Sequence, residues 1–112
     1  MIEEINFIEY EVSSGNVFAD MDLEDADELL LRAKLGYTVR KILENRHLKQ
    51  QEIAELLNIK QPEVSNLMNG KYHLFSESRL FGLLNKLEHK ITIQISQHHR
   101  GEAFQDLVLI ND

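Results

Sequence analysis

The only proline of this chain, Pro62, stands between two short runs that both have the composition of helices. It lies within EIAELLNIKQPEVSNLMNGK, residues 52–71. A proline deep inside a helix costs about 3 kcal/mol, whereas in the first turn its missing N–H would have had no partner anyway. Pro62 therefore predicts the start of a second helix. Pro62 disfavours the helical backbone conformation at the residue before it. Gln61 is therefore expected at the N-cap or first helical position.

The join between the two helices falls at Asn58 and Ile59. Asparagine tolerates the left-handed conformation that a sharp turn between helices requires. The sequence thus predicts helices over residues 50–57 and 61–69, with Gly70 as the stop after the second. Two such helices joined by three or four residues form a helix-turn-helix. The residues expected to face the rest of the domain are Ile53, Leu57, Ile59, Val64 and Leu67, with Ala54 at the close crossing.

Helical patterns also lie on both sides of this motif. Asp22 is a good N-cap for a helix that ends near residues 45–47, and Gly36 leaves open whether this is one helix or two. Ser76 is expected to cap a further helix. The apolar stripe of that helix is Leu80, Leu83, Leu84 and Leu87.

Strand signals occur near the two ends of the chain. Ile91, Ile93 and Ile95 alternate with polar residues, which predicts a strand over residues 90–96. A shorter strand is expected over 107–110, and residues 5–12 suggest a weak strand or an extended arm. Three partners remain open for the 90–96 strand: its twin across a dimer axis, the 107–110 strand, or the N-terminal arm.

Length and composition bound the class of protein. The chain has 112 residues, which fits one domain with a modest core. It has no cysteine, so neither disulfides nor a thiolate metal site can stabilise it. No apolar run approaches the roughly 20 residues that span a bilayer, and the N-terminus lacks the pattern of a signal peptide. A cytoplasmic location is expected.

The net charge of −7 is unevenly distributed. Residues 1–31 hold ten acids and no Lys or Arg, whereas the other 81 residues hold twelve basic residues and nine acids, a net of +3. Such asymmetry is typical of two surfaces with different partners. The alternative is that acids gather there because Asp and Glu favour helix starts.

Residues 50–69 resemble the helix-turn-helix of the XRE or Cro/repressor-like family of DNA-binding proteins. The family usually has Gly where this chain has Asn58, and Ser or Thr at the caps where it has Lys49 and Lys60. These lysines weaken the caps but add positive charge where phosphates would lie. The resemblance implies a mainly α, lambda-repressor-like domain, here with a short C-terminal β-strand and an N-terminal arm.

A second resemblance narrows the first. SSGNVFADMDLEDADELLLRAKL, residues 13–35, is similar to the lead-in of HigA-like antitoxins of RelE/HigB-type toxin–antitoxin systems. The similarity implies a homodimer that represses its own operon and neutralises a basic ribonuclease toxin. No cofactor is expected. Two alternatives stay open: an XRE-family regulator without a toxin, and a helix-turn-helix used only for protein contacts.

The helix-turn-helix places its second helix in the major groove, with the N-terminal residues facing base edges. Gln61 and Asn66 carry amides able to pair bidentately with adenine, and Lys60 could reach guanine or a phosphate. The alternative is an ordinary solvated helix face. The predicted DNA-binding residues are Lys49, Gln50, Lys60, Gln61, Pro62, Ser65, Asn66, Lys71 and Tyr72.

The acidic residues must lie away from the DNA, which leaves the first third of the chain for another role. One hypothesis is toxin binding by residues 1–31, and the other is that this segment folds back on its own domain or swaps across a dimer. The predicted organisation is an acidic arm over 1–21, a helix-turn-helix domain over 22–89 and a strand extension over 90–112. The apolar anchors proposed for the toxin are Phe7, Tyr10, Val12, Val17 and Phe18.

An enzymatic role is not expected. His98 and His99, with His89 and Asp106, do not have the spacing of a zinc site, and neighbouring side chains on a strand point to opposite faces. The sequence also contains no nucleophile-elbow or phosphate-loop motif.

Overall fold

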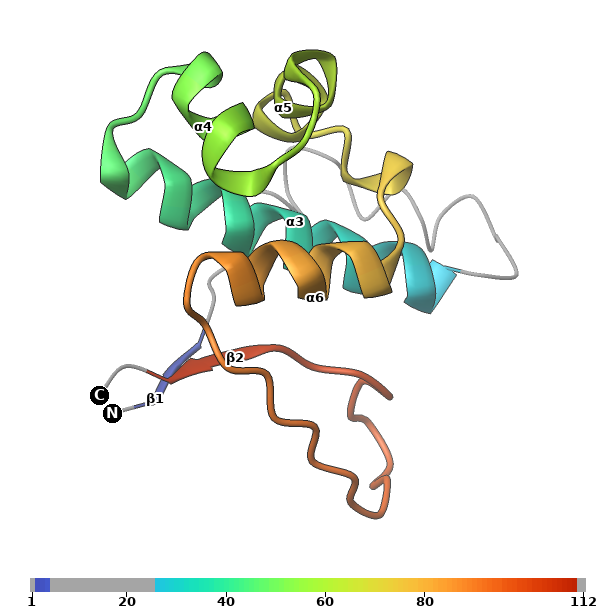
Figure 1. Ribbon diagram of the computed structural model, residues 1–112. Coiled ribbons are helices and arrows are strands. Elements are labelled where there is room, and N and C mark those ends of the chain that lie inside the picture. The colour runs from blue at the N-terminus through green and yellow to red at the C-terminus, as the bar shows by residue number, and fades with distance from the viewer. Residues whose placement is uncertain (1, 5–25, 111–112) are drawn as a thin grey trace.

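The computed structural model describes residues 2–4 and 26–110 of the chain (Figure 1). Its elements are β1 (Ile2–Glu4), α3 (Ala26–Arg46), α4 (Gln50–Leu57), α5 (Gln61–Met68), the 3-10 helix η1 (Tyr72–Leu74), α6 (Glu77–Lys86) and β2 (Val108–Ile110). The predicted mainly helical class is confirmed. The expected Asp22 cap and the N-terminal residues 5–25 lie outside the described residues.

Helix α3 crosses the middle of the molecule, with α4 and α5 on one side and α6 on the other (Figure 1). It is one helix, so Gly36 does not break it. The reason for a glycine there is close packing: a Cβ at Gly36 would lie 2.7 Å from the Cβ of Tyr72 and closer still to its ring. Gly36 therefore lets η1 approach the backbone of α3.

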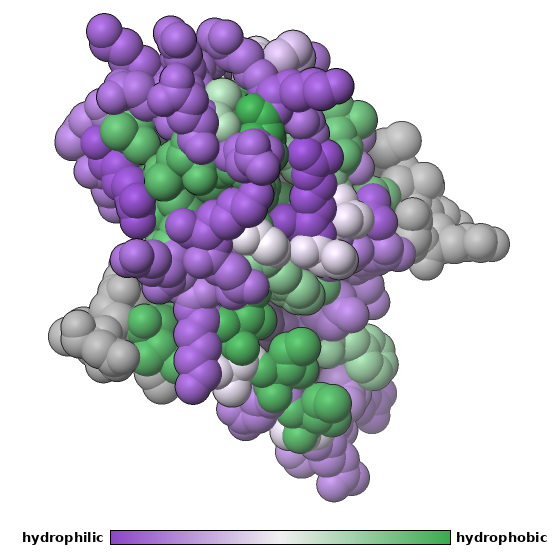
Figure 2. Space-filling view, in the orientation of Figure 1, coloured by the Kyte–Doolittle hydropathy of each residue, from purple (hydrophilic) through white to green (hydrophobic). Residues whose placement is uncertain are grey.

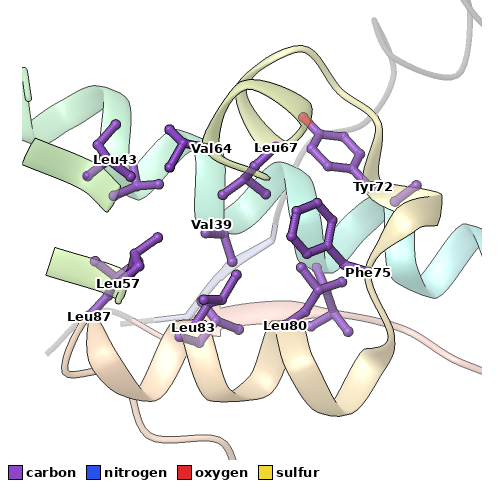
Figure 3. Close-up of a cluster of buried hydrophobic side chains, with 14 residues drawn as sticks. Val39, Leu43, Leu57, Val64, Leu67, Tyr72, Phe75, Leu80, Leu83 and Leu87 are labelled. Carbon is purple, nitrogen blue, oxygen red and sulfur yellow. The ribbon is translucent and has the colours of Figure 1, made fainter. Parts of the chain in front are cut away.

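The core lies where α3, α4, α5 and α6 meet (Figure 3). Its side chains are at most 6% exposed, and those of the helix-turn-helix are at most 1% exposed. The predicted stripe of α6 is confirmed as core, and so are four of the five residues expected to anchor the motif; the fifth, Ile59, is partly buried against it. The labelled core side chains in Figure 3 are Val39, Leu43, Leu57, Val64, Leu67, Tyr72, Phe75, Leu80, Leu83 and Leu87.

Helix α6 is joined to α3 by charges as well as by leucines. The predicted cap is confirmed, because the Ser76 hydroxyl accepts a hydrogen bond from the Arg79 N–H at 3.1 Å. Arg32 on α3 donates to Glu77 at 3.1 Å and to Glu28 at 2.6 Å. Burial opposes ionisation of Glu77, but the hydrogen bonds from its backbone and from Arg32 lower its pKa. The start of α6 is thus held against α3.

The strands differ in part from the prediction. The shorter C-terminal strand forms as β2 and pairs antiparallel with β1, with Ile2 opposite Ile110 and Glu4 opposite Val108. The prediction of a strand over residues 90–96 is wrong for the single chain: among the described residues this segment has no ladder partner. Alternation marks a strand-like face, but a strand also needs a neighbouring backbone to bond.

Candidate nucleic-acid interface

The turn between α4 and α5 has the predicted backbone. Asn58 adopts the left-handed conformation, with φ 54° and ψ 49°, and its N–H and that of Ile59 bond back to carbonyls of α4. Pro62 lies in the first turn of α5, where its missing N–H leaves no bond unmade. Gly70, with φ +80°, follows the end of α5. The turn, the start of α5 and the stop after α5 each have a residue type that favours the backbone conformation found there.

The first turns of α4 and α5 are capped by glutamates. Neither the Lys49 nor the Lys60 side chain caps its helix, as the sequence indicated. Instead, the backbone N–H of Lys49 donates to Glu52 at 2.9 Å, and that of Lys60 donates to Glu63 at 3.1 Å. This is the half of a capping box that the third helical residue supplies. Sequence reasoning missed these two caps, although Lys-Gln-x-Glu occurs at both 49–52 and 60–63.

The negative charge of Glu63 is also balanced by a residue of a neighbouring helix. Its carboxylate pairs with Arg79 of α6, whose guanidinium lies 5.6 Å from the centre of the Phe75 ring. The hydrogen bond from the Lys60 backbone, followed by Arg79, lowers the pKa of Glu63. The carboxylate in the first turn of α5 is therefore held in contacts within the protein, and Arg79 partly balances its negative charge against an approaching phosphate.

The tip of α5 is exposed while its inner face is fixed. Gln61 and Pro62 are exposed, whereas Val64 and Leu67 are 0% exposed and anchor the helix in the core. Ser65 and Asn66 are half-buried, and the Ser65 hydroxyl accepts a hydrogen bond from Asn69 at 3.2 Å. The tip of α5 is thus available to a partner. The buried inner face prevents α5 from rotating about its axis.

Exposed lysines stand at the N-caps of three successive helical elements. Lys49, Lys60 and Lys71 precede α4, α5 and η1 and are all exposed, eleven residues apart. The first turn of an α-helix carries a partial positive charge, so the lysines at α4 and α5 add to a potential of the same sign. In the space-filling view, hydrophilic residues form the outer rim of the surface over α4 and α5, with hydrophobic residues visible between them (Figure 2). Gln50, at the first position of α4, is exposed as well.

Tyr72 does not belong to this surface. Its side chain is 2% exposed and packs against Gly36, and burial raises its pKa while Arg40 opposes the rise. Among the described residues its hydroxyl makes no hydrogen bond of good geometry, although the Arg40 guanidinium is its electrostatic partner. The prediction that Tyr72 is a DNA-binding residue is therefore wrong, and Tyr72 belongs to the core. The sequence pattern could not distinguish the two because Tyr occurs in both settings.

The remaining predicted sites divide into two groups. Phe7, Tyr10, Val12, Val17 and Phe18 lie outside the described residues. The His98 ring stacks on Phe104, with centroids 3.9 Å apart, and its Nε2 lies 3.0 Å from the Glu102 carbonyl oxygen. Within residues 2–4 and 26–110 no cluster of His, Asp and Glu could hold a metal, and none of the helices described there is long and apolar enough to cross a membrane.

Comparison with known proteins agrees with this geometry. The family described as "Helix-turn-helix domain" matches residues 17–96. A solved structure named "Putative XRE Family Transcriptional Regulator" is 33% identical to this chain and superposes with a TM-score of 0.68. The match covers 79% of this chain and 99% of that one. No curated protein gave a significant match.

Proposed function

This chain belongs to the helix-turn-helix domain family, and from that membership we propose that it is a transcriptional regulator that binds double-stranded operator DNA through the tip of α5. The observation that carries the proposal is the contrast within one helix. Gln61 is exposed at the first position of α5, while Val64 and Leu67 are fully buried. A polar tip on a fixed helix is the arrangement that reads base edges in a major groove.

The proposed contacts follow from side-chain chemistry. The Gln61 amide is suited to adenine, and Ser65 and Asn66 lie one turn further along α5. Lys49, Lys60 and Lys71 would pair with phosphates, which fixes the register without reading sequence. Gln50 is placed for a phosphate, and Pro62 for van der Waals contact with the groove.

A gel-shift titration with the DNA upstream of its own gene tests this proposal. Gln61→Ala should weaken specific binding by about 1–3 kcal/mol and relax the sequence preference at one position. Gln105→Ala removes the same side chain from an exposed position of the C-terminal segment and should bind as the wild type does. Equal binding by all three proteins would show that α5 does not read the DNA.

We further propose that the regulator is an antitoxin that represses its own operon as a homodimer and neutralises a basic ribonuclease toxin. The support is the resemblance of residues 13–35 to HigA-like antitoxins and the ten acids among residues 1–31, which suit a basic partner. Phe7, Tyr10, Val12, Val17 and Phe18 would be the apolar anchors. The alternative is an XRE-family regulator without a toxin.

Co-expression with the adjacent gene separates these two functions. An antitoxin should co-purify with a small basic neighbour and inhibit its ribonuclease activity. Removing residues 1–20 should abolish that inhibition while leaving the DNA complex intact, because the helix-turn-helix lies elsewhere in the chain. Full inhibition by the shortened chain would refute toxin binding through this segment.

A further inference from the structure

Two long basic side chains of α6 reach the helix-turn-helix on either side of its turn. Arg79, in the first turn of α6, pairs with Glu63 in the first turn of α5. Lys86, the last residue of α6, donates a hydrogen bond of 2.5 Å to the carbonyl oxygen of Leu57, the last residue of α4. The two basic residues are seven positions apart, about two helical turns, so they lie on one face of α6. Helix α6 therefore spans the turn between α4 and α5.

Helix α6 is itself fixed to α3 at both of its ends. At its start, Glu77 accepts the hydrogen bond of 3.1 Å from Arg32. At its end, Arg46 of α3 donates to the carbonyl oxygen of Leu87 at 3.3 Å. The two helices run alongside each other in Figure 1, with the leucines of α6 buried in the core. Helix α6 is therefore a fixed support against which α4 and α5 can be oriented.

The first turn of α5, residues 61–63, has no buried apolar side chain of its own. Gln61 and Pro62 are exposed and Glu63 is half-buried, whereas the buried anchors Val64 and Leu67 follow later in the helix. Burial of apolar surface has no preferred direction, so it holds α5 against the core without setting the angle of its tip. Hydrogen bonds and ion pairs depend on direction. The angle of the tip therefore depends on the contacts of Glu63, and through Glu63 on α6.

Lys86 has the corresponding position at the end of α4. The last carbonyl groups of a helix have no partner within the helix, and they carry a partial negative charge that an ammonium group complements. The Leu57 carbonyl that Lys86 contacts directly precedes Asn58, whose left-handed backbone starts the turn. A contact at this carbonyl fixes the point from which the chain leaves α4 for α5.

We propose that Arg79 and Lys86 are positioning residues that hold the tip of α5 at the angle at which Gln61 distinguishes one base from another, without contacting the DNA. The inference deepens the proposed function and rests on it. A side chain that reads a base must be held within about 0.5 Å of its position, because hydrogen bonds weaken steeply outside a narrow geometry. Lysines that pair with phosphates are flexible and tolerate a tilted tip. Loss of the α6 contacts should therefore reduce base discrimination more than affinity for DNA in general.

Binding of the full chain to two duplexes of equal length tests this separation, one from upstream of its own gene and one with the same bases shuffled. Arg79→Ala should lower the ratio of the two affinities by at least about fivefold, the lower end of what one base-reading side chain contributes. Lys86→Met removes the ammonium group but keeps the aliphatic stem, and it should lower the ratio as well. The matched controls are Arg100→Ala and Lys90→Met at exposed positions of the C-terminal arm, residues 90–110, and they should keep the ratio of the wild type.

A double-mutant cycle tests whether Arg79 acts through Glu63. Glu63→Gln keeps an acceptor for the Lys60 N–H, because glutamine also serves in a capping box, but it removes the charge pair with Arg79. Arg79→Ala should therefore lower the ratio less in the Glu63→Gln protein than in the wild type, and Arg79→Lys should keep most of the ratio. Additive effects of the two changes would overturn the route through Glu63. An equal loss of affinity for both duplexes would make Arg79 a source of positive charge only and would overturn the inference.

Residual dipolar couplings of the backbone N–H groups test the orientation of α5 in the chain without DNA. In Arg79→Ala the couplings of α5 should depart from the wild-type orientation, while those of α3 and α6 keep it; unchanged couplings of α5 would overturn the inference. Circular dichroism should show the helix content of the wild type, since Arg79 is an exposed residue. A wild type that binds both duplexes equally would refute the proposed function itself. A wild type that prefers the upstream duplex, with variants that keep this preference, would refute only the role of α6.

Discussion

Gly36→Ala should destabilise the protein although alanine is the better helix former. Gly36 lies within α3, and a Cβ added there would lie 2.7 Å from the Cβ of Tyr72. A Cβ cannot rotate away, so either η1 or α3 must move. Tyr72 is 2% exposed, and its neighbours in the core leave it little room.

The magnitude follows from two opposing terms. Overpacking of a core typically costs about 1–3 kcal/mol. Replacing glycine by alanine inside a helix returns about 1 kcal/mol. The net expectation is a loss of up to about 2 kcal/mol, or up to roughly 8 °C in melting temperature for a chain of this length.

Gly82→Ala in α6 is the matched control, since no atom lies within 4 Å of a Cβ added there. This variant should gain up to about 1 kcal/mol from helix propensity alone. Urea titrations followed by circular dichroism would compare the two free energies of unfolding. If Gly36→Ala were as stable as Gly82→Ala, the close packing of η1 against α3 would be refuted.

Three further predictions concern charge and burial. Lys60→Ala should lower the slope of log K against log salt for DNA binding by about 1, whereas Lys90→Ala on the arm should not; equal slopes would remove Lys60 from the interface. Tyr72→Phe should change the free energy of unfolding by less than about 1 kcal/mol and leave DNA affinity intact, because the buried hydroxyl makes no hydrogen bond of good geometry and only its interaction with Arg40 is lost; a clear loss of affinity would restore a DNA contact for Tyr72. The pKa of Glu63 is lowered from 4.5 in the folded chain, so its contribution to stability is present above that value and is lost as the pH falls through the folded pKa. Glu63→Gln should therefore flatten the acid limb of stability against pH, and an unchanged acid limb would contradict the Lys60 and Arg79 contacts.

The parts of the fold that depend on local backbone chemistry could be predicted from the sequence. Pro62 marks the first turn of α5, and Asn58 takes the left-handed turn. Gly70 has a positive φ after α5, and Ser76 caps α6. In each case one residue type is suited to one backbone conformation, so no distant partner has to be known.

The parts that depend on distant partners could not be predicted. Gly36 reads as a helix break until Tyr72, 36 residues later, is placed against it. The alternation over residues 90–96 predicts an apolar face but not the backbone that pairs with it. The Glu52 and Glu63 caps, in contrast, are predictable from the sequence, because Lys-Gln-x-Glu recurs at the start of both short helices.

The candidate interface also contains residues that local sequence predicts and a residue that depends on a distant partner. Gln61 and Lys60 follow from the position of Pro62, and both are exposed. The prediction for Tyr72 is wrong because the burial of Tyr72 depends on Gly36, which lies in another helix. The role of residues 5–25 stays a prediction, since they lie outside the described residues.

The most direct test of DNA reading by α5 is an NMR titration of the ¹⁵N-labelled chain with duplex DNA from upstream of its own gene. The account predicts that the Gln61 side-chain amide and the backbone amides of Ser65 and Asn66 shift on binding, while Ile95 and Phe104 on the arm do not. Shifts confined to the arm, with the Gln61 amide unmoved at saturation, would contradict it.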